Sequence, residues 1–177
     1  MNLTCLPKIG FTHYAWCMTI LYILTKNKTI GSIAFNYSNS ALIGYEGSYY
    51  VSSEPYNKLK IYFKNKHNIS DSTFEKLNFI VHYIPSIYLF YHRNQWNFIK
   101  YPYIFGFKTF FTQIIWAFLT CNSLDVLNGV YLPEDETFKT VTKKHKYCIW
   151  LLTLNGHLTN AYISYFEKYK YLIINNL

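Results

Sequence analysis

Arginine is almost absent from this sequence: of its 17 basic residues only Arg93 is an arginine, and the others are lysines. A protein that reads nucleic acid usually needs arginine for bidentate contacts with phosphates and bases. Glycine and alanine are also scarce, whereas lysine, asparagine, isoleucine, tyrosine and phenylalanine abound, as in the products of an A/T-rich genome. We therefore discount the net charge of +8 and do not expect nucleic acid to be a partner.

The sequence also lacks a complete catalytic, nucleotide-binding or metal-binding signature. The cysteines Cys5, Cys17, Cys121 and Cys148 are widely spaced and form no CxxC pair, so we expect small buried apolar side chains there. The apolar stretch after Lys8 has no small-residue cleavage site of the kind that ends a secretory signal peptide. We expect no cofactor and no metal, and the question of catalysis stays open with a non-enzymatic protein favoured.

Charged residues make up only 15% of the chain and hydrophobic residues 51%. A membrane-spanning helix needs about 20 mostly apolar residues, fewer when tyrosine and tryptophan extend it into the interface. We therefore predict an all-α fold, a polytopic membrane bundle of four or five transmembrane helices in a single domain, 1–177. The predicted spans are 9–25, 29–45, 77–91, 103–121 and 147–166.

The second of these segments is the weakest, because Asn36, Ser38, Asn39 and Ser40 interrupt it. From residue 30 to 63 the residues are β-friendly and punctuated by turn signals, which also fits three short strands. The alternative fold is therefore a soluble α+β domain whose apolar helices form its core. The mean hydropathy of −0.01 favours that alternative.

The third segment has the clearest local features. Ser70 followed by Asp71 predicts a capped helix start, and the helix should run into the apolar segment up to Tyr91. Pro85 interrupts this segment. An interior proline frees a carbonyl one turn earlier, so we expect a neighbouring group to pair with that carbonyl.

Four polar residues within the predicted spans are the candidate site residues: Asn78, His82, Asn155 and His157. Asn78 and His82 stand four residues apart and should share one helix face beside Pro85. Buried ionisable groups often line cavities or relay protons, but they also hydrogen-bond neighbouring helices. We favour a packed polar interface over catalysis.

Histidines could also hold a metal. Three of them, His13, His82 and His157, fall within predicted spans, and three converging imidazoles would suit zinc. Hydrogen bonding of each ring to a neighbouring helix is the simpler interpretation, so we predict no metal site.

The composition, with the Asn36–Gly44 and His82–Pro85 segments, resembles the uncharacterised multi-span membrane proteins of A/T-rich large DNA viruses, the mimivirus-like group. That resemblance implies no known activity. A fainter similarity links Asn78, His82 and Pro85 to the androgen-induced-gene hydrolases, which are intramembrane Thr/His lipid hydrolases. The proline lies closer to His82 than in that family, and no equivalent of its catalytic threonine is found.

Three functions follow as hypotheses. The first is an integral membrane protein acting as a structural or assembly subunit of a viral, host endomembrane or organellar membrane, with the lipid bilayer, other membrane subunits or itself as partners. The second is a small intramembrane enzyme or transporter using His82 and His157. The third is a soluble basic nucleic-acid-binding factor.

Overall fold

The computed structural model describes residues 11–92, 102–121 and 143–175, and each regular element in these ranges is an α-helix. The helices are α1 (Phe11–Thr25), α2 (Lys28–Val51), α3 (Glu54–His67), α4 (Asp71–Tyr91), α5 (Pro102–Cys121) and α6 (Lys143–Asn175).

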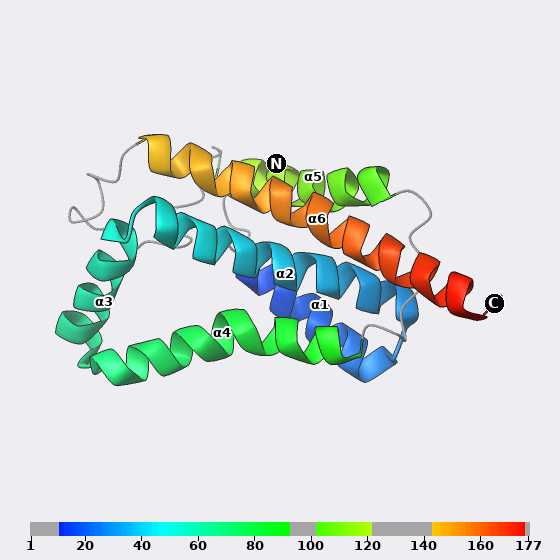
Figure 1. The fold of residues 1–177 in the computed structure, drawn as a ribbon. Coiled ribbons are helices and arrows are strands. Elements are labelled where there is room, and N and C mark those ends of the chain that lie inside the picture. Colours follow the sequence, from blue (N-terminus) through cyan, green and yellow to red (C-terminus); the bar gives the residue numbers. More distant parts are fainter. Residues whose placement is uncertain (1–10, 93–101, 122–142, 176–177) are drawn as a thin grey trace.

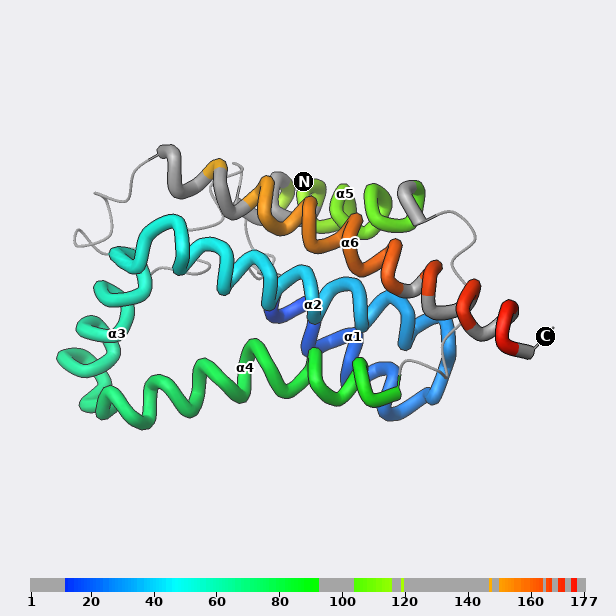
Figure 2. The backbone as a smooth tube through the Cα atoms, in the orientation of Figure 1, coloured from blue at the N-terminus to red at the C-terminus, as the bar shows by residue number. Residues whose placement is uncertain are grey.

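Helix α2 is the centre of the bundle. It packs against α1, α4 and α6 and touches α5, which lies along α6. The short helix α3 crosses from the end of α2 to the start of α4 (Figure 1). Helix α4 therefore forms one outer side of the bundle, and α5 with α6 forms the opposite side (Figure 2).

Polar side chains set the ends of the helices. Asn27 Oδ1 accepts a hydrogen bond from the Thr29 backbone N–H at 2.9 Å and so caps α2. Asn68 ends α3 in the left-handed conformation (φ 54°). Asparagine adopts this conformation at little cost. Ser70 Oγ accepts from the Thr73 N–H at 3.2 Å, so the predicted helix start at Ser70 and Asp71 is confirmed.

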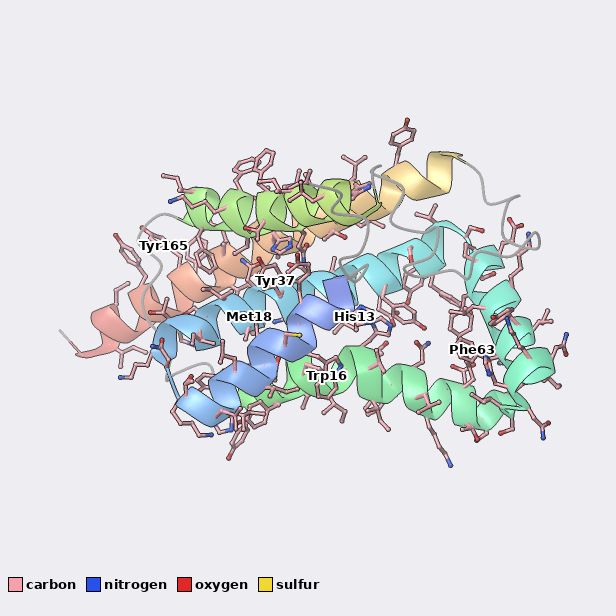
Figure 3. All side chains as sticks on the ribbon, turned by 180° about the vertical axis from the view of Figure 1, so that it is seen from behind. His13, Trp16, Met18, Tyr37, Phe63 and Tyr165 are labelled. Atoms are coloured by element: carbon pink, nitrogen blue, oxygen red, sulfur yellow. The ribbon has the colours of Figure 1, made fainter. Side chains whose placement is uncertain are left out.

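Pro85 lies inside α4, where its missing N–H leaves the carbonyl of Val81 without its intrahelical donor. The indole Nε1–H of Trp16 donates to that carbonyl at 2.9 Å. Trp16 projects from α1 toward α4 (Figure 3). The expectation that a neighbouring group would pair with the freed carbonyl is confirmed, and the bond ties α1 to α4.

Glycines bring α2 and α6 into close contact. A Cβ on Gly44 would lie 2.9 Å from Thr153 Oγ1, and a Cβ on Gly156 would lie 2.9 Å from Ser40 Cα. Real side chains do not approach that closely, so these glycines set the distance between the two helices. Two of the polar residues that weakened the second segment as a predicted span, Asn36 and Ser40, contact α6, whereas the Ser38 hydroxyl lies 3.3 Å from that of Thr19 on α1.

The prediction of a membrane bundle is wrong. Within the described residues, no helix combines the length and the apolar character that crossing a bilayer requires. Helix α1 has 15 residues, about 22 Å at 1.5 Å per residue, against a hydrocarbon core of about 30 Å. The longer helices α2 and α6 carry many polar residues. The predicted integral-membrane localisation is therefore wrong. So are the predicted transmembrane spans, 9–25, 29–45, 77–91, 103–121 and 147–166. Residues 9 and 10 lie outside the described ranges.

The alternative of strands between residues 30 and 63 is also wrong, because this stretch forms α2 and α3. The Ser40 hydroxyl donates to the Asn36 carbonyl one turn earlier at 2.6 Å, so serine is accommodated within α2. The turn signal at Ser52 and Ser53 is real and separates the two helices. Packing of small residues against three neighbouring helices outweighs the β propensity of this segment.

Candidate functional site

His157, on α6, is the centre of a buried polar cluster. Its side chain is 0% exposed and contacts Asn36 of α2 together with Thr109 and Gln113 of α5. Its Nε2 lies 2.9 Å from Gln113 Oε1 and its Nδ1 3.0 Å from Thr109 Oγ1, and Nδ1 also contacts Asn36 Oδ1. Asn36 Nδ2 donates to the His157 carbonyl at 3.1 Å. The cluster thus joins three helices.

Aromatic rings close this cluster. The ring of Tyr37 meets the His157 imidazole edge-on with centroids 5.5 Å apart, and its hydroxyl donates to the Thr109 carbonyl at 3.3 Å. Figure 3 shows Tyr37 on the side of α2 that faces α5. Phe110 also packs against the imidazole, with ring centroids 5.9 Å apart. No face of His157 is left for a substrate.

Burial lowers the pKa of His157 to about 3, so the ring is neutral near pH 7 and has one N–H. Gln113 Nε2 is buried without a partner among the described residues. Turning that carboxamide by 180° lets Gln113 donate to His157 Nε2, while Nδ1–H donates to Asn36 Oδ1. This tautomer pairs both ring nitrogens.

The Thr109–His157 contact has the geometry of a hydroxyl and its base. However, Thr109 Oγ1 also lies 3.0 Å from the carbonyls of Phe105 and Gly106, which accept its single proton when Nδ1 is protonated. Thr109 is itself buried. The cluster is therefore suited to holding α2, α5 and α6 in register, and the geometry does not favour a nucleophile.

A second polar site is a cavity of about 340 Å³ bounded by α2, α3 and α4. Five aromatic rings, two carboxylates and one amide line it: Tyr45, Tyr49, Tyr56, Phe79, Tyr83, Glu46, Glu75 and Asn78. The two carboxylates come from different helices, α2 and α4. The site exists because α3 crosses the end of the bundle and separates the ends of α2 and α4 (Figure 1).

The hydroxyls of the cavity are paired with its carboxylates. Tyr83 donates to Glu46 Oε1, and Tyr56 donates to Glu75 Oε2. The hydrogen bond to Glu46 and burial raise the pKa of Tyr83 to about 12; burial and Glu75 raise the pKa of Tyr56 to about 12. The hydrogen bonds from Tyr56 and Lys60 lower the pKa of Glu75, which keeps this carboxylate ionised.

Lysines of α3 form ion pairs with the start of α4. Lys60 Nζ lies 2.9 Å from Glu75 Oε1 and 3.7 Å from Asp71 Oδ2, and Lys64 Nζ lies 3.6 Å from Asp71 Oδ1. Exposed pairs of this kind contribute little stability. They do mean that Lys60 balances the charge of Glu75, whereas Glu46 forms no salt bridge with any residue in the described ranges.

The structure places Asn78 and His82 on one face of α4, and both contact Tyr45 of α2. Asn78 Nδ2 donates to the Tyr45 hydroxyl, and the His82 ring stacks on the Tyr45 ring with centroids 4.1 Å apart. Burial lowers the pKa of His82 to about 4, so this imidazole is neutral near pH 7.

The other candidates lie elsewhere. His82 meets α2 at Tyr45 and His157 meets it at Asn36, nine residues apart and therefore about 13 Å along the helix axis. The two histidines belong to separate sites. Asn155 is exposed, whereas Thr153, His157 and Asn160 are buried, so Asn155 is not part of the interior.

Among the described residues, no group of three histidine, cysteine, aspartate or glutamate side chains is arranged to hold a metal ion. His13 is exposed on α1, away from the His157 cluster.

Several site residues could not be picked out of the sequence. Gln113 stands in an apolar segment as a lone amide, which is a usable signal for a buried partner. In the sequence, Asn36 stands out only as an interruption of its apolar segment. Tyr45, Glu46 and Glu75 give no local signal, because their convergence depends on how α3 orients α4.

Comparisons of the chain with protein-family models, with curated proteins and with solved structures give no match.

Proposed function

We propose that this chain is a structural subunit that assembles with copies of itself through the apolar outer face of α4. The observation that carries the proposal is a heptad-spaced stripe of exposed apolar side chains: Leu77, Ile80, Ile84, Ile87 and Tyr91, at least 40% exposed each. Their spacing alternates between three and four residues. A 3-4 spacing of apolar residues is the pattern with which one helix packs along another.

The stripe faces away from the bundle. His82 and Leu89, seven residues apart, lie on the inner side of α4. His82 stacks on Tyr45 of α2, and Leu89, which is 0% exposed, packs with Tyr22 of α1 and Phe35 of α2. Both lie on the opposite side of α4 from Ile80, Ile84 and Ile87, as the period of 3.6 residues requires. Within the described residues, the face of α4 that carries His82 and Leu89 is therefore covered, and the face that carries the apolar stripe stays exposed.

Helix α5 has a second exposed, mostly apolar face, formed by Ile104, Phe107, Phe111 and Ile115 with Lys108 at its edge. It lies on the opposite side of the bundle from α4 (Figure 1). A single self-complementary face closes a dimer, whereas two faces on opposite sides allow an assembly to grow. This arrangement supports an open assembly of several copies rather than a closed dimer.

A second copy is the partner that suits the α4 face best. Its five heptad positions carry no charge, so the stripe is compatible with itself across a two-fold axis. Ile80, Ile84 and Ile87 retain about half of their exposed surface, and covering it contributes about 1 kcal/mol per side chain. Six such side chains in a pair give about 6 kcal/mol, which is within the range that association costs in lost freedom. We therefore expect assembly through the α4 face to be weak and to depend on concentration.

Sedimentation velocity of the purified chain over a range of concentrations tests the proposal. The wild-type chain should sediment faster than a monomer. Ile84→Lys should shift it toward smaller species, because each of the two copies would bury a lysine in the interface. Ile61→Lys is the matched control, since Ile61 is also exposed (58%) but lies on α3. Far-UV circular dichroism establishes that both variants stay helical. A monomeric wild-type chain, or equal effects of the two substitutions, would rule the proposal out.

A further inference from the structure

The cavity between α2, α3 and α4 is not used by the assembly proposed above. Its volume of about 340 Å³ lies near the lower end of the range of small-molecule pockets, roughly 300–1,000 Å³. It would accept a small ligand rather than a nucleotide or a peptide.

Aromatic rings dominate the walls of this cavity. Tyr49 meets Tyr56 edge-on with ring centroids 5.3 Å apart, and Tyr45 lies 6.3 Å from Tyr56. Tyr83 and Phe79, one turn apart on α4, stack with centroids 5.1 Å apart. The face of an aromatic ring is negative and attracts cations, and rings from α2, α3 and α4 surround this cavity.

The charge of the lining has the same sign. Glu46 and Glu75 both line the cavity; within the described residues Glu75 forms a salt bridge, with Lys60, and Glu46 forms none. His82, behind Tyr45, brings no positive charge near pH 7 because burial keeps its imidazole neutral. The cavity therefore has about one uncompensated negative charge, at Glu46, next to a wall of tyrosines.

The geometry points to a binding site for a small organic ammonium ion, with its charged group near Glu46 and its alkyl groups against the tyrosine and phenylalanine rings. An inorganic cation would need several oxygen ligands at close range, whereas here one oxygen of Glu46 already accepts from Tyr83, and the two oxygens of Glu75 accept from Tyr56 and Lys60. An alkylammonium needs only one carboxylate and a set of ring faces.

Isothermal titration calorimetry with choline and with 3,3-dimethylbutanol, its neutral isostere, tests the site. Both probes have the same shape, so a difference in affinity reports the charge. We expect choline to bind at least tenfold more tightly than the neutral probe. Equal affinities, or no heat with either probe, would overturn the inference. A parallel titration with phosphocholine distinguishes a free ammonium compound from a headgroup: weaker binding than choline assigns the site to the former.

Two matched substitutions locate the binding. Glu46→Gln keeps the shape of the side chain and an acceptor for Tyr83, and it should weaken choline binding about tenfold without changing the affinity for the neutral probe. Glu54→Gln is the control, because Glu54 is an exposed carboxylate of α3 that pairs with Lys58 and does not line the cavity. Equal losses in both variants would show a non-specific charge effect and refute the site. Circular dichroism of both variants excludes unfolding as the cause.

Discussion

Acid should destabilise this chain well before its carboxylates titrate, because two of its histidines are buried in neutral form. Burial lowers the pKa of His157 to about 3 and that of His82 to about 4, against about 6.5 in the unfolded chain. Both folded-state values lie below the unfolded value. The unfolded chain therefore binds protons that the folded chain does not, and stability falls as the pH drops below about 6.5.

The size of the effect follows from the same values. Between pH 7 and pH 5 each histidine should remove about 2 kcal/mol from the free energy of unfolding, or about 4 kcal/mol together. A domain of this size is stable by roughly 5–15 kcal/mol, so the loss is a large fraction of the total. At about 2–4 °C per kcal/mol, the midpoint of thermal unfolding should fall by about 10 °C.

Thermal unfolding followed by circular dichroism at the two pH values measures this loss. His157→Gln and His82→Gln should each remove about half of the pH dependence, since glutamine does not titrate, although His157→Gln also lowers the stability at pH 7 by disturbing the contacts with Asn36 and Gln113. His13→Gln removes an exposed histidine and is the control. A midpoint that is the same at both pH values, or a pH dependence that is undiminished in both buried-site variants, would refute the assignment of neutral buried imidazoles.

The helices of the described residues were largely predictable from the sequence, but their surroundings were not. The ends of α1, α4 and α5 at Thr25, Tyr91 and Cys121 agree with the ends of apolar segments, because charge and turn residues stop a helix locally. From the sequence alone, the apolar content of those segments predicts exposure to lipid. In the structure part of it covers other helices, and the stripe that includes Ile84 stays exposed, a distinction that hydropathy does not make.

The site shows the same division between local and distant information. Asn78 and His82 reach the same tyrosine because residues four apart share a face of any α-helix. Which face of α6 turns inward is set by contacts 121 residues away in the chain, between His157 and Asn36. Asn155 precedes His157 by two residues, about 200° around the helix. A segment with polar residues on several faces therefore gives no local sign of which one is buried.

The remaining predictions concern how the helices are joined. Trp16→Phe should cost about 1 kcal/mol in urea unfolding, because it removes the hydrogen bond to the Val81 carbonyl. It should cost about 1 kcal/mol less in the Pro85→Ala background, where the restored N–H pairs with that carbonyl; equal costs would refute the role of the indole. Gly156→Ala and Gly47→Ala each place a Cβ 2.9 Å from a neighbouring carbon, but only the first meets backbone, of α2, and the second meets the end of a leucine side chain. Alanine favours a helix by about 1 kcal/mol over glycine. Gly47→Ala should therefore be neutral or stabilising, because the leucine can move. Gly156→Ala should lose about 1–2 kcal/mol net, because α6 must move away from α2. Equal effects in urea unfolding would mean that these glycines do not set the distance between the two helices.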